Sequence, residues 1–509
     1  MIDLDRVSFP SELKEILADR ELVGHNLWFD LAFLKVRFQI PPGNLFDTMT
    51  AAKILTNGLP EGTVSNSLGS VISRYLGIDI LKDQGTSDWS ASQLSDEQLR
   101  YAAMDVHHLL PLKAELERLL ELDQLVYVAE LENDLLPAVI DLYLRGFAVD
   151  RATLETMLAD AELAKQVAAR KLKTVLNAPD LNVNSNLQLL NAFAVIGLAL
   201  PNTNKRTISQ NHDHPAVEAL IEYRRVKSAY TEKMESLLEA IRPDGRIHSR
   251  YDPLGTDTGR FSCKEPNIQQ VPGARKAPIR KAFRAPAGRT LIKLDYNQME
   301  LRAAMSWTGE TNGIVAFQAG QDLHQNIASI VKVQRSLGKT INFGNIYGQN
   351  AKGFARRVKE NEGLNITVEE AEFYRCKFFE LYPGLSAWHK ASWNLVRYTE
   401  LTEVRTPYGR RRLIPKEVTD WEKFTSAVNV PIQGGCADAV KFSMIDLNAV
   451  LPEGTFLVAA MHDELVLETD IEKAAEIEVL AKKIMEKWAG AIFDKVPMLV
   501  EAKTCESWG

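Results

Sequence analysis

The sequence predicts a multidomain protein of mixed α/β and α+β class. Its 509 residues are 45% hydrophobic and 25% charged, an ordinary globular composition at a length that suits roughly two to four domains. Residues 1 to 120 alternate strand-like and helical segments, residues 121 to 245 are mostly helical, and strand patterns with glycines and prolines return from residue 246. These changes predict a domain boundary near residue 246 and layers of both kinds.

Net charge, cysteine spacing and the length of apolar runs indicate the class of protein and its compartment. The net charge of −7 gives no overall positive field, although an acidic enzyme can still carry a basic cleft. The cysteines are far apart and form no CxxC pair, which favours reduced thiols over a disulfide framework or a zinc site. The N-terminus lacks a signal-peptide pattern, and the longest apolar run, residues 189–201, is too short to span a bilayer. We expect a soluble intracellular protein.

Several segments predict particular elements. Residues 21–38, "ELVGHNLWFDLAFLKVRF", predict a short strand, a turn and an apolar helix. Residues 94–120 predict a helical segment with Ser95 as its N-cap, because acidic residues follow in the first turn. Residues 290–295 predict a strand and residues 311–400 a helical region, and the strand patterns near the C-terminus include a hairpin with acidic residues at its tip.

Acidic residues interrupt two of these apolar segments. Asp295 ends an alternating strand and Glu300 follows just inside a helix, while His462, Asp463 and Glu464 separate two apolar runs. Solvated strand ends explain each case equally well when it is taken alone. Burial of an unpaired charge is costly, however, and Mg²⁺ prefers carboxylate oxygens together with substrate phosphates. A shared site requires the strands of Asp295 and Asp463 to be neighbours in one sheet, which sequence alone leaves open.

A basic and aromatic stripe follows one predicted helix. In "RSLGKTINFGNIYG", residues Arg335, Lys339, Phe343 and Tyr347 are four positions apart and span about 120° of one helix face. An amphipathic helix explains the stripe but not Gly344, since a helical glycine usually marks close packing or a bend. Two cations followed by two aromatic rings suit a nucleotide, with phosphates on the cations and sugar and base on the rings.

Together these segments resemble family A DNA polymerases, the DNA polymerase I family. The stretch 295–302, "DYNQMELR", is similar to motif A of that family, residues 335–348 match the motif B pattern RxxxKxxxFGxxYG, and "HDE" at 462–464 is similar to motif C. The resemblance extends over nearly the whole chain. Further similar segments are "TGRFSCKEPNIQQVP" (258–272), "IRKAF" (279–283), "GQDLH" (320–324), "TPYGRRR" (406–412), "NVPIQGGCAD" (429–438) and the ending from residue 496.

The resemblance implies a right-hand polymerase fold of thumb, palm and fingers, preceded by a truncated ribonuclease H-like exonuclease domain. It implies a partial 3′–5′ exonuclease-like domain at 1–120, a thumb at 121–250, the first part of the palm at 251–310, fingers at 311–415 and the second part of the palm at 416–509. The implied activity is template-directed addition of deoxynucleotides to a primer 3′-hydroxyl, with primer–template DNA and dNTPs as partners. We expect a monomer in the cytoplasm of a bacterial or phage-infected cell.

The resemblance also assigns the polymerase site. Asp295 and Asp463 would hold two Mg²⁺ ions, Glu464 would support them, and Lys339 would give a proton to pyrophosphate. The implied dNTP-binding residues are Gln298, Glu300, His324, Arg335, Lys339, Phe343 and Tyr347, and the implied DNA-binding residues are Arg260, Asn267, Gln270, Arg280, Asn429, Gln433 and His462. A separate charge signal agrees, since residues 246–302 carry twelve lysines and arginines against five acidic residues.

Some features depart from the family pattern. His324 and Arg335 are only eleven positions apart, which resembles the compact fingers of phage enzymes. Thr425 occupies a position where many relatives have an arginine that contacts the minor groove. Each change is local and leaves the three polymerase motifs intact.

The N-terminal region departs further. "GHNLWFDLAFL" resembles the second exonuclease motif, with Asn26 and Asp30, and "YAAMD" resembles the third, with Tyr101 and Asp105. The first motif, a DxE on an earlier strand, has no good match, because "DLD" at 3–5 is too close to Asp30 and has the wrong second acid. We therefore expect proofreading to be absent or severely impaired. A fragment and a true loss both remain open.

Three other functions are compatible with parts of the sequence. A single-subunit RNA polymerase shares the carboxylate and lysine chemistry, but Glu300 and the HDE triplet argue against it, since the RNA enzymes have a small residue near the first position. A catalytically silent DNA-binding replisome protein would have no need for the intact polymerase carboxylates and lysine. A nuclease is disfavoured by the incomplete acid set.

Overall fold

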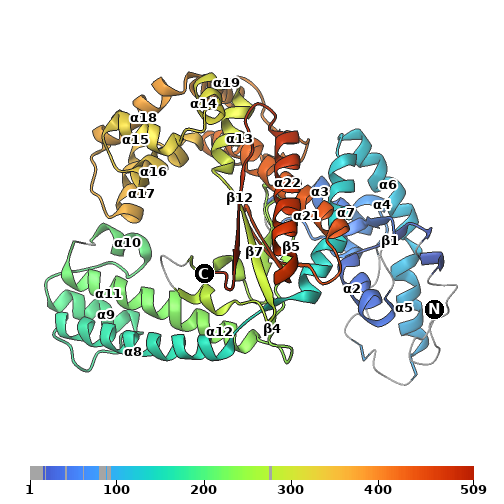
Figure 1. Ribbon diagram of the computed structural model, residues 1–509, viewed down its shortest axis with the longest axis horizontal. Coiled ribbons are helices and arrows are strands. Elements are labelled where there is room, and N and C mark those ends of the chain that lie inside the picture. The colour runs from blue at the N-terminus through green and yellow to red at the C-terminus, as the bar shows by residue number, and fades with distance from the viewer. Residues whose placement is uncertain are drawn as a thin grey trace.

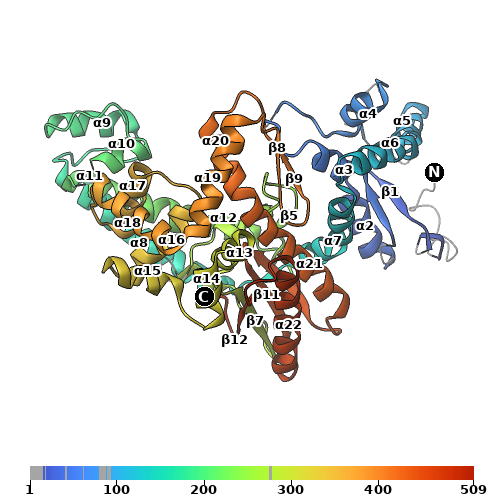
Figure 2. The same ribbon diagram turned by 90° about the horizontal axis from the view of Figure 1, so that it is seen from above.

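The computed structural model of the protein describes residues 15–17, 19–39, 43–60, 62–79, 87–88, 93–211, 213–273 and 278–509. Three groups of elements follow one another around the molecule, and the N-terminal region lies to one side of them, at the right in both views (Figures 1 and 2). The "DLD" segment at 3–5, and Arg275 and Lys276 of the basic stretch, lie outside the described residues.

The N-terminal region is built from a parallel pair of strands and surrounding helices. The strand, turn and helix predicted for residues 21–38 are present, and Ser95 forms the predicted cap: it accepts a hydrogen bond from Gln98 N (3.2 Å), while Gln98 Oε1 accepts one from Ser95 N (2.9 Å). The elements are β1 (Leu22–Gly24), α2 (Leu27–Phe38), β2 (Leu45–Asp47), α3 (Thr48–Leu55), α4 (Leu68–Leu76), α5 (Asp96–His107), α6 (Leu109–Leu122) and α7 (Val126–Arg145).

A long helical arm follows, as the sequence predicts. The helix α8 (Arg151–Val175) packs along α11 (Pro215–Val226), and both bury apolar residues such as Leu172 and Leu220 between them. This arm forms the lower left wall in Figure 1. Its other elements are α9 (Asn186–Val195), α10 (Lys205–Gln210), the π-helix η1 (Lys227–Glu232) and α12 (Lys233–Ala240).

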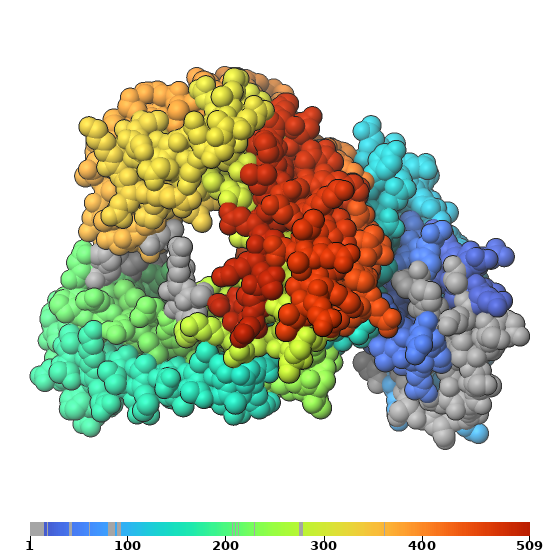
Figure 3. Space-filling model, viewed as in Figure 1, coloured from blue at the N-terminus to red at the C-terminus, as the bar shows by residue number. Residues whose placement is uncertain are grey.

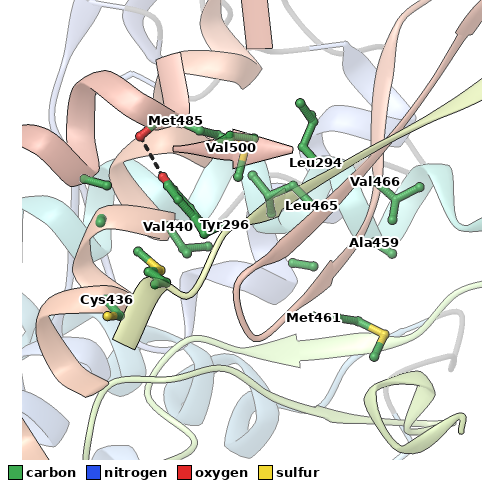
Figure 4. Packing of buried hydrophobic residues seen from close by; sticks show 14 of the residues in the cluster. Leu294, Tyr296, Cys436, Val440, Ala459, Met461, Leu465, Val466, Met485 and Val500 are labelled. Atoms are coloured by element: carbon green, nitrogen blue, oxygen red, sulfur yellow. Dashed lines mark hydrogen bonds between the residues drawn. The ribbon is translucent and has the colours of Figure 1, made fainter. Parts of the chain in front are cut away.

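A four-stranded antiparallel sheet forms the centre of the protein. Its order is β10 (Phe456–Met461), β11 (Glu464–Asp470), β7 (Arg289–Tyr296) and β12 (Val500–Cys505). The helices α21 (Gly435–Val450) and α22 (Ala474–Ile492) pack against it. Figure 4 shows Leu294, Val440 and Leu465 in this core, where Tyr296 Oη donates a hydrogen bond to Met485 O (2.7 Å). The predicted strand at 290–295 and the predicted acid-tipped hairpin are therefore confirmed.

The predicted helical middle forms the third wall, at the upper left of Figure 1. Gly344 packs closely, as its position predicts, because a Cβ there would lie 2.9 Å from Phe354 Cδ2. The helices are α13 (Met299–Thr308), α14 (Thr311–Gln318), α15 (Leu323–Val331), α16 (Arg335–Ile346), α17 (Ala351–Glu362), α18 (Val368–Leu381), α19 (Pro383–Tyr398), α20 (Asp420–Asn429) and the π-helix η4 (Val430–Gly434).

Short elements complete the fold between these walls. Three two-stranded antiparallel pairs are β3 (Phe147–Ala148) with β4 (Arg246–Ile247), β5 (Arg250–Asp252) with β6 (Ser262–Lys264), and β8 (Glu403–Arg405) with β9 (Arg411–Leu413). The 3₁₀ turns are η2 (Ile268–Gln270), η3 (Pro278–Ala282) and η5 (Ile471–Lys473).

The three walls enclose an opening that is visible in the space-filling view (Figure 3). At its far rim, Lys359 Nζ of α17 lies 3.7 Å from Asp213 Oδ2 in the turn before α11, so the arm and the fingers approach one another. In the part of the chain that the structure describes, no helix has the length and apolar character needed to cross a bilayer. The fold therefore presents a cleft whose floor is the end of the central sheet.

Candidate active site

The sheet brings the predicted carboxylates together. Asp295 is the penultimate residue of β7 and pairs in register with Glu464 on β11 and with Glu501 on β12. Asp463 lies in the turn between β10 and β11, where its carbonyl accepts a hydrogen bond from Tyr296 N (3.3 Å). The strands that carry Asp295 and Asp463 are thus neighbours, which is the condition that the sequence alone left open.

The charges of these acids are unequally compensated. Glu464 accepts a hydrogen bond from Trp508 Nε1 (2.6 Å) and lies 3.6 Å from Lys293 Nζ and 3.8 Å from Arg280 Nη1. Asp295 and Asp463 form no ion pair with any other described residue. Burial and the neighbouring Asp463, Glu464 and Glu501 raise the pKa of Asp295 to about 7, and burial, with Glu300 nearby, also raises the pKa of Asp463.

This imbalance fits a bound cation. Two uncompensated hard-oxygen ligands are the donor set that Mg²⁺ uses, with water and substrate phosphates completing its shell. No group of three or more histidine, cysteine or acidic side chains arranged to hold a metal occurs among the described residues. The protein's own share of such a site would therefore be the two aspartates, and the rest of the shell would come from the substrate.

A cavity of about 500 Å³ lies above the acids. It joins the end of the palm sheet to α16 of the fingers, so phosphates bound there would meet carboxylates on one side and cations on the other. Its lining is Arg260, Asp295, Tyr296, Asn297, Gln298, Met299, Glu300, His324, Arg335, Lys339, Phe343, His462, Asp463 and Glu501. The predicted nucleotide-binding residues line it, with the exception of Tyr347.

The cations of α16 face this cavity. Lys339 Nζ lies 5.7 Å from the centre of the Phe343 ring, so the two side chains lie on the same helix face. Arg335 Nε donates a hydrogen bond to Asp322 Oδ2 (2.6 Å), and half of its side chain is exposed. Burial acts to raise the pKa of Asp322, but the hydrogen bond and charge of Arg335 and the backbone amides of His324 and Gln325 together outweigh it, so the pKa is lowered.

His324 is held as a neutral donor. The side-chain Nδ2 of Asn342 donates a hydrogen bond to Leu323 O (3.1 Å) and lies 2.8 Å from His324 Nδ1. Because Nδ2 is a donor, His324 Nδ1 is the acceptor, and the proton of the neutral ring is on Nε2. Burial lowers the pKa of His324 to about 4, with further lowering by Arg335 and Lys339. A neutral Nε2–H that lines the cavity can donate to a phosphate oxygen without carrying charge.

Glu300 is fixed by two partners. One carboxylate oxygen accepts a hydrogen bond from Arg260 Nη2, and the other accepts one from Tyr347 Oη. Burial, followed by the charge of Glu300, raises the pKa of Tyr347 well above its ordinary value, so the phenol remains a donor. Tyr347 thus lies behind Glu300 and holds its carboxylate at the cavity wall.

The predicted DNA-binding residues divide into three groups. Arg260 and His462 line the cavity. Asn267 precedes η2 and Gln270 ends it, while Asn429 ends α20 and Gln433 lies in η4. The amide oxygens of Asn267, Asn429 and the nucleotide-site residue Gln298 are buried and have no hydrogen-bond partner among the described residues, which is the condition of groups that await a ligand.

Arg280 is already bound to protein. Its guanidinium donates to Val271 O (3.3 Å from both Nε and Nη2) and lies 4.1 Å from the Trp508 ring centre. The structure therefore gives Arg280 a role in packing the palm, beside the expected contact with DNA.

Sequence reasoning missed a group of buried charges beneath the DNA-facing segments. Arg410 Nε donates to Asp438 Oδ1 (2.8 Å), and both Arg410 and Lys441 contact Glu132 of α7. A Cβ at Gly259 would lie 2.6 Å from Arg410 Nε, so this guanidinium packs directly under the segment that carries Arg260. Burial lowers the pKa of Lys441 to about 8. The sequence signals were the "TPYGRRR" and "NVPIQGGCAD" similarities, which contain Arg410 and Asp438.

Glu501 and Asn297 were also missed. Both line the cavity, and Asn297 Nδ2 donates to Glu501 Oε1. An acid within the C-terminal strand pattern gives no hint of its partner, because its position opposite Asp295 depends on the pairing of β12 with β7.

The exonuclease-like residues come from two helices of the N-terminal region. Asn26 and Asp30 belong to the start of α2, and Tyr101 and Asp105 belong to α5. Asp47, the acid nearest to Asp30, accepts hydrogen bonds from the amides of Asn26 (2.9 Å) and Leu27 (3.0 Å) and so serves as a cap. Burial raises the pKa of Asp105 and, together with Asp47, that of Asp30.

Comparison with known proteins agrees with this geometry. The family model of DNA polymerase family A matches residues 152–509, and the model of a 3′-5′ exonuclease matches residues 4–121. The chain belongs to DNA polymerase family A. This membership confirms the expected family, the right-hand fold with an exonuclease-like N-terminal region, and the class of DNA-directed DNA polymerase.

Bacterial DNA polymerases are among the similar proteins. The chain is 32% identical to DNA polymerase I of Aquifex aeolicus (strain VF5), over all of this chain and 91% of that protein. It is 32% identical to the thermostable DNA polymerase I of Thermus aquaticus over 94% of this chain, and it spans 57% of that longer protein. The polymerase domain of Pol1 from M. smegmatis, in complex with DNA primer-template and dNTP, has the same fold, with a TM-score of 0.84 at 24% identity, covering 100% of this chain and 90% of that one.

Proposed function

We propose that this member of family A adds deoxynucleotides to a primer 3′-hydroxyl by two-metal phosphoryl transfer. One observation carries the proposal: the pairing of β7 with β11 gathers Asp295, Asp463 and Glu464 at one end of the sheet, across a single cavity from Arg335 and Lys339. Opposed carboxylates and cations are the arrangement that phosphoryl transfer requires, because the metal ions and the cations share the triphosphate charge.

The two aspartates are the proposed ligands of Mg²⁺. When bound, two such ions would lower the pKa of the primer hydroxyl and stabilise the leaving pyrophosphate. Glu464, already held by Trp508, Lys293 and Arg280, keeps its neighbours in place and is not itself a ligand.

The fingers bind the nucleotide in this proposal. Arg335 and Lys339 hold the triphosphate, and the neutral His324 donates a hydrogen bond from Nε2. Lys339 also provides the proton for pyrophosphate as the P–O bond breaks. Phe343 packs on the sugar, and Glu300 blocks the 2′ position because Tyr347 and Arg260 fix its carboxylate.

Primer–template DNA would lie in the opening between the walls, with Gln298 at the nucleotide and the seven predicted DNA-binding residues along the growing end. The opening is bounded by the proposed thumb (121–250), fingers (311–415) and two parts of the palm (251–310 and 416–509). The proposed exonuclease-like domain is 1–120. A monomer in the cytoplasm remains the proposed state and place of action.

Proofreading is proposed to be absent or severely impaired. The support is that "DLD" at 3–5 has Asp5 in the place of the glutamate of the DxE motif. A two-metal nuclease needs its full carboxylate set. Robust 3′-hydrolysis of single-stranded DNA that disappears in Asp105→Ala would contradict this.

Primer extension with Mg²⁺ tests the function. Parent protein and Asp463→Ala are given DNA and RNA templates, with dNTPs and rNTPs in parallel. We expect extension with dNTPs by the parent and none by the variant. Extension by Asp463→Ala equal to that of the parent would refute the assignment, and equal use of rNTPs would favour an RNA polymerase.

A further inference from the structure

A cluster of buried charges lies beneath the segment that carries Arg260. Glu132 Oε1 accepts hydrogen bonds from Arg410 Nη2 and from Lys441 Nζ. Arg410 Nε also donates one to Asp438 Oδ1 (2.8 Å). Two acids and two cations balance, so the cluster buries no net charge when all four are ionised. The members of this buried charge cluster are each at most 2% exposed: Glu132 of α7, Arg410 of the hairpin between β8 and β9, and Asp438 and Lys441 of α21.

Stability alone does not explain the buried charge cluster. Moving ion pairs out of water costs about as much free energy as their attraction returns, and apolar side chains of similar volume often stabilise a protein equally well. Hydrogen-bonded charges do fix the direction of each side chain, because a misdirected charge is costly in a low-dielectric interior. The groups that the two cations contact besides the acids therefore indicate what the cluster does.

Both cations also contact the segment 253–261. Lys441 Nζ donates a hydrogen bond to Pro253 O (2.8 Å) and lies 5.6 Å from the centre of the Phe261 ring. Arg410 packs against Gly259, which has a positive φ of 81° and whose Cβ, if present, would lie 2.6 Å from Arg410 Nε. The buried charge cluster thus supports this segment at its start and on both sides of Arg260.

Arg260 leads from this segment to the nucleotide cavity. Its guanidinium donates to Glu300, and both residues line the cavity. The position of the Glu300 carboxylate therefore depends on where the backbone places Arg260. A displacement of about 1 Å in such a supporting residue is enough to loosen a site.

We propose that Lys441 and Arg410 are positioning residues for the discrimination between deoxyribose and ribose. They hold the segment 253–261 so that Arg260 fixes the carboxylate of Glu300 at the 2′ position. The inference rests on the proposed function, in which Glu300 blocks that position. Neither cation touches the nucleotide, since both are buried beneath the segment.

Single-nucleotide insertion tests the proposal. The ratio of kcat/KM for a dNTP to that for the matching rNTP is measured for the parent, Lys441→Met, Glu300→Ala and the double variant of these two. Lys441→Met should lower the ratio by about 3- to 10-fold, and by less than Glu300→Ala, because the gate is displaced rather than removed. In the Glu300→Ala background, Lys441→Met should cause no further loss, because the buried charge cluster acts only through Glu300.

A merely structural role is separated by a matched pair of buried acids. Glu468 resembles Glu132: it is fully buried, its Oε1 binds two arginines, and its Oε2 has no hydrogen-bond partner among the described residues. It lies opposite Leu291, toward the start of β7 and away from Asp295. Glu132→Gln and Glu468→Gln should both lower the Tm, but only Glu132→Gln should lower the ratio. If Lys441→Met fails to fold, Glu132→Gln with Lys441→Met keeps the charges balanced and takes its place.

The outcomes separate this inference from the function on which it rests. A parent-like ratio in Lys441→Met would overturn the positioning role. Additive losses in the double variant with Glu300→Ala, or an equal loss of the ratio in Glu468→Gln and Glu132→Gln, would also overturn it. A ratio that is unchanged in Glu300→Ala would refute the proposed gate itself.

Discussion

Two regions of the protein carry acidic residues that match metal-binding motifs, and they differ in how the fold arranges them. In the palm, adjacent strands bring Asp295 beside Glu464 and Glu501, with Asp463 in the next turn. In the N-terminal region, Asp30 and Asp105 belong to helices α2 and α5, and the nearby Asp47 is occupied with backbone amides. Strand pairing thus brings the palm acids together, whereas the N-terminal acids are carried by helices.

The acidic side chains at the end of the palm sheet repel one another electrostatically. Asp295 lies among Asp463, Glu464 and Glu501, and burial together with these acidic neighbours raises its pKa to about 7. Such repulsion is relieved by a cation, so the protein gives up some stability to hold the site ready. In the N-terminal region, burial is the main cause of the raised pKa values of Asp30 and Asp105.

The largest expected effect is at the palm aspartates. Asp295→Ala should lower the rate of single-nucleotide insertion by about 10³-fold or more, since several kcal/mol of metal stabilisation are lost. Affinity for primer–template should change by less than about 3-fold, since DNA is held mainly by contacts elsewhere. Rapid-quench kinetics and a binding titration check both, with Asp30→Ala as the control that should resemble the parent.

Replacement of Lys339 tests whether α16 takes part in the nucleotide chemistry or is only a basic helix. Lys339→Ala should lower the insertion rate by about 10²- to 10³-fold, because a phosphate contact and a general acid disappear together. Lys377→Ala, on the surface of α18, is the control. A variant that weakened DNA binding alone would show that α16 is only a basic helix.

Glu300 tests the sugar gate. Glu300→Ala should reduce the preference for dNTPs over rNTPs by roughly 10-fold or more, because a side chain that fills the 2′ position is removed. Glu300→Gln keeps the shape and should keep more of the preference. Competition between the two nucleotides on one template measures the ratio, and an unchanged ratio in the alanine variant would exclude Glu300 as the gate.

The pKa of Asp295 predicts a pH effect on stability. The folded-state pKa is raised from 3.8 to about 7. Between pH 3.8 and about pH 7, Asp295 is therefore protonated in the folded protein but ionised in the unfolded chain. The stability of the metal-free protein consequently falls as the pH rises through this range. Asp295→Asn should therefore raise the Tm at pH 8 in EDTA but not at pH 4. Solvent screening keeps the shift to a few degrees. A rise in Tm at pH 4 without a rise at pH 8 would contradict this prediction.

The smallest expected effect is in the N-terminal region. The double variant Asp30→Ala, Asp105→Ala should insert nucleotides at the rate of the parent and hydrolyse 3′ ends no more slowly. A nuclease assay on single-stranded DNA, with Mg²⁺ and with Mn²⁺, gives the comparison.

Local patterns predicted the elements well. The alternating apolar residues gave β7, β10 and β11, Ser95 gave the start of α5, and the spacing of Arg335, Lys339 and Phe343 gave one face of α16. These features depend on residues close in sequence, where strand and helix periods apply directly. Gly344 likewise predicted close packing, which Phe354 provides.

The sequence did not predict which distant segments of the chain pair with one another. The order of the central sheet decides that Glu501 faces Asp295, and no local pattern specifies that order. The π-helix η4 was missed because Pro431 removes an amide donor and shifts the helical register in a segment that otherwise continues α20. The charge cluster of Arg410, Asp438 and Glu132 joins elements far apart along the chain.

One assay tests the central difference most directly. A 5′-labelled primer on a DNA template is incubated with the parent protein and Mg²⁺, once with the next dNTP and once without any nucleotide, and both lengthening and shortening of the primer are followed. The account predicts lengthening by one nucleotide with dNTP, and an intact primer without it. Shortening at a rate comparable to insertion, abolished by Asp105→Ala, would contradict it.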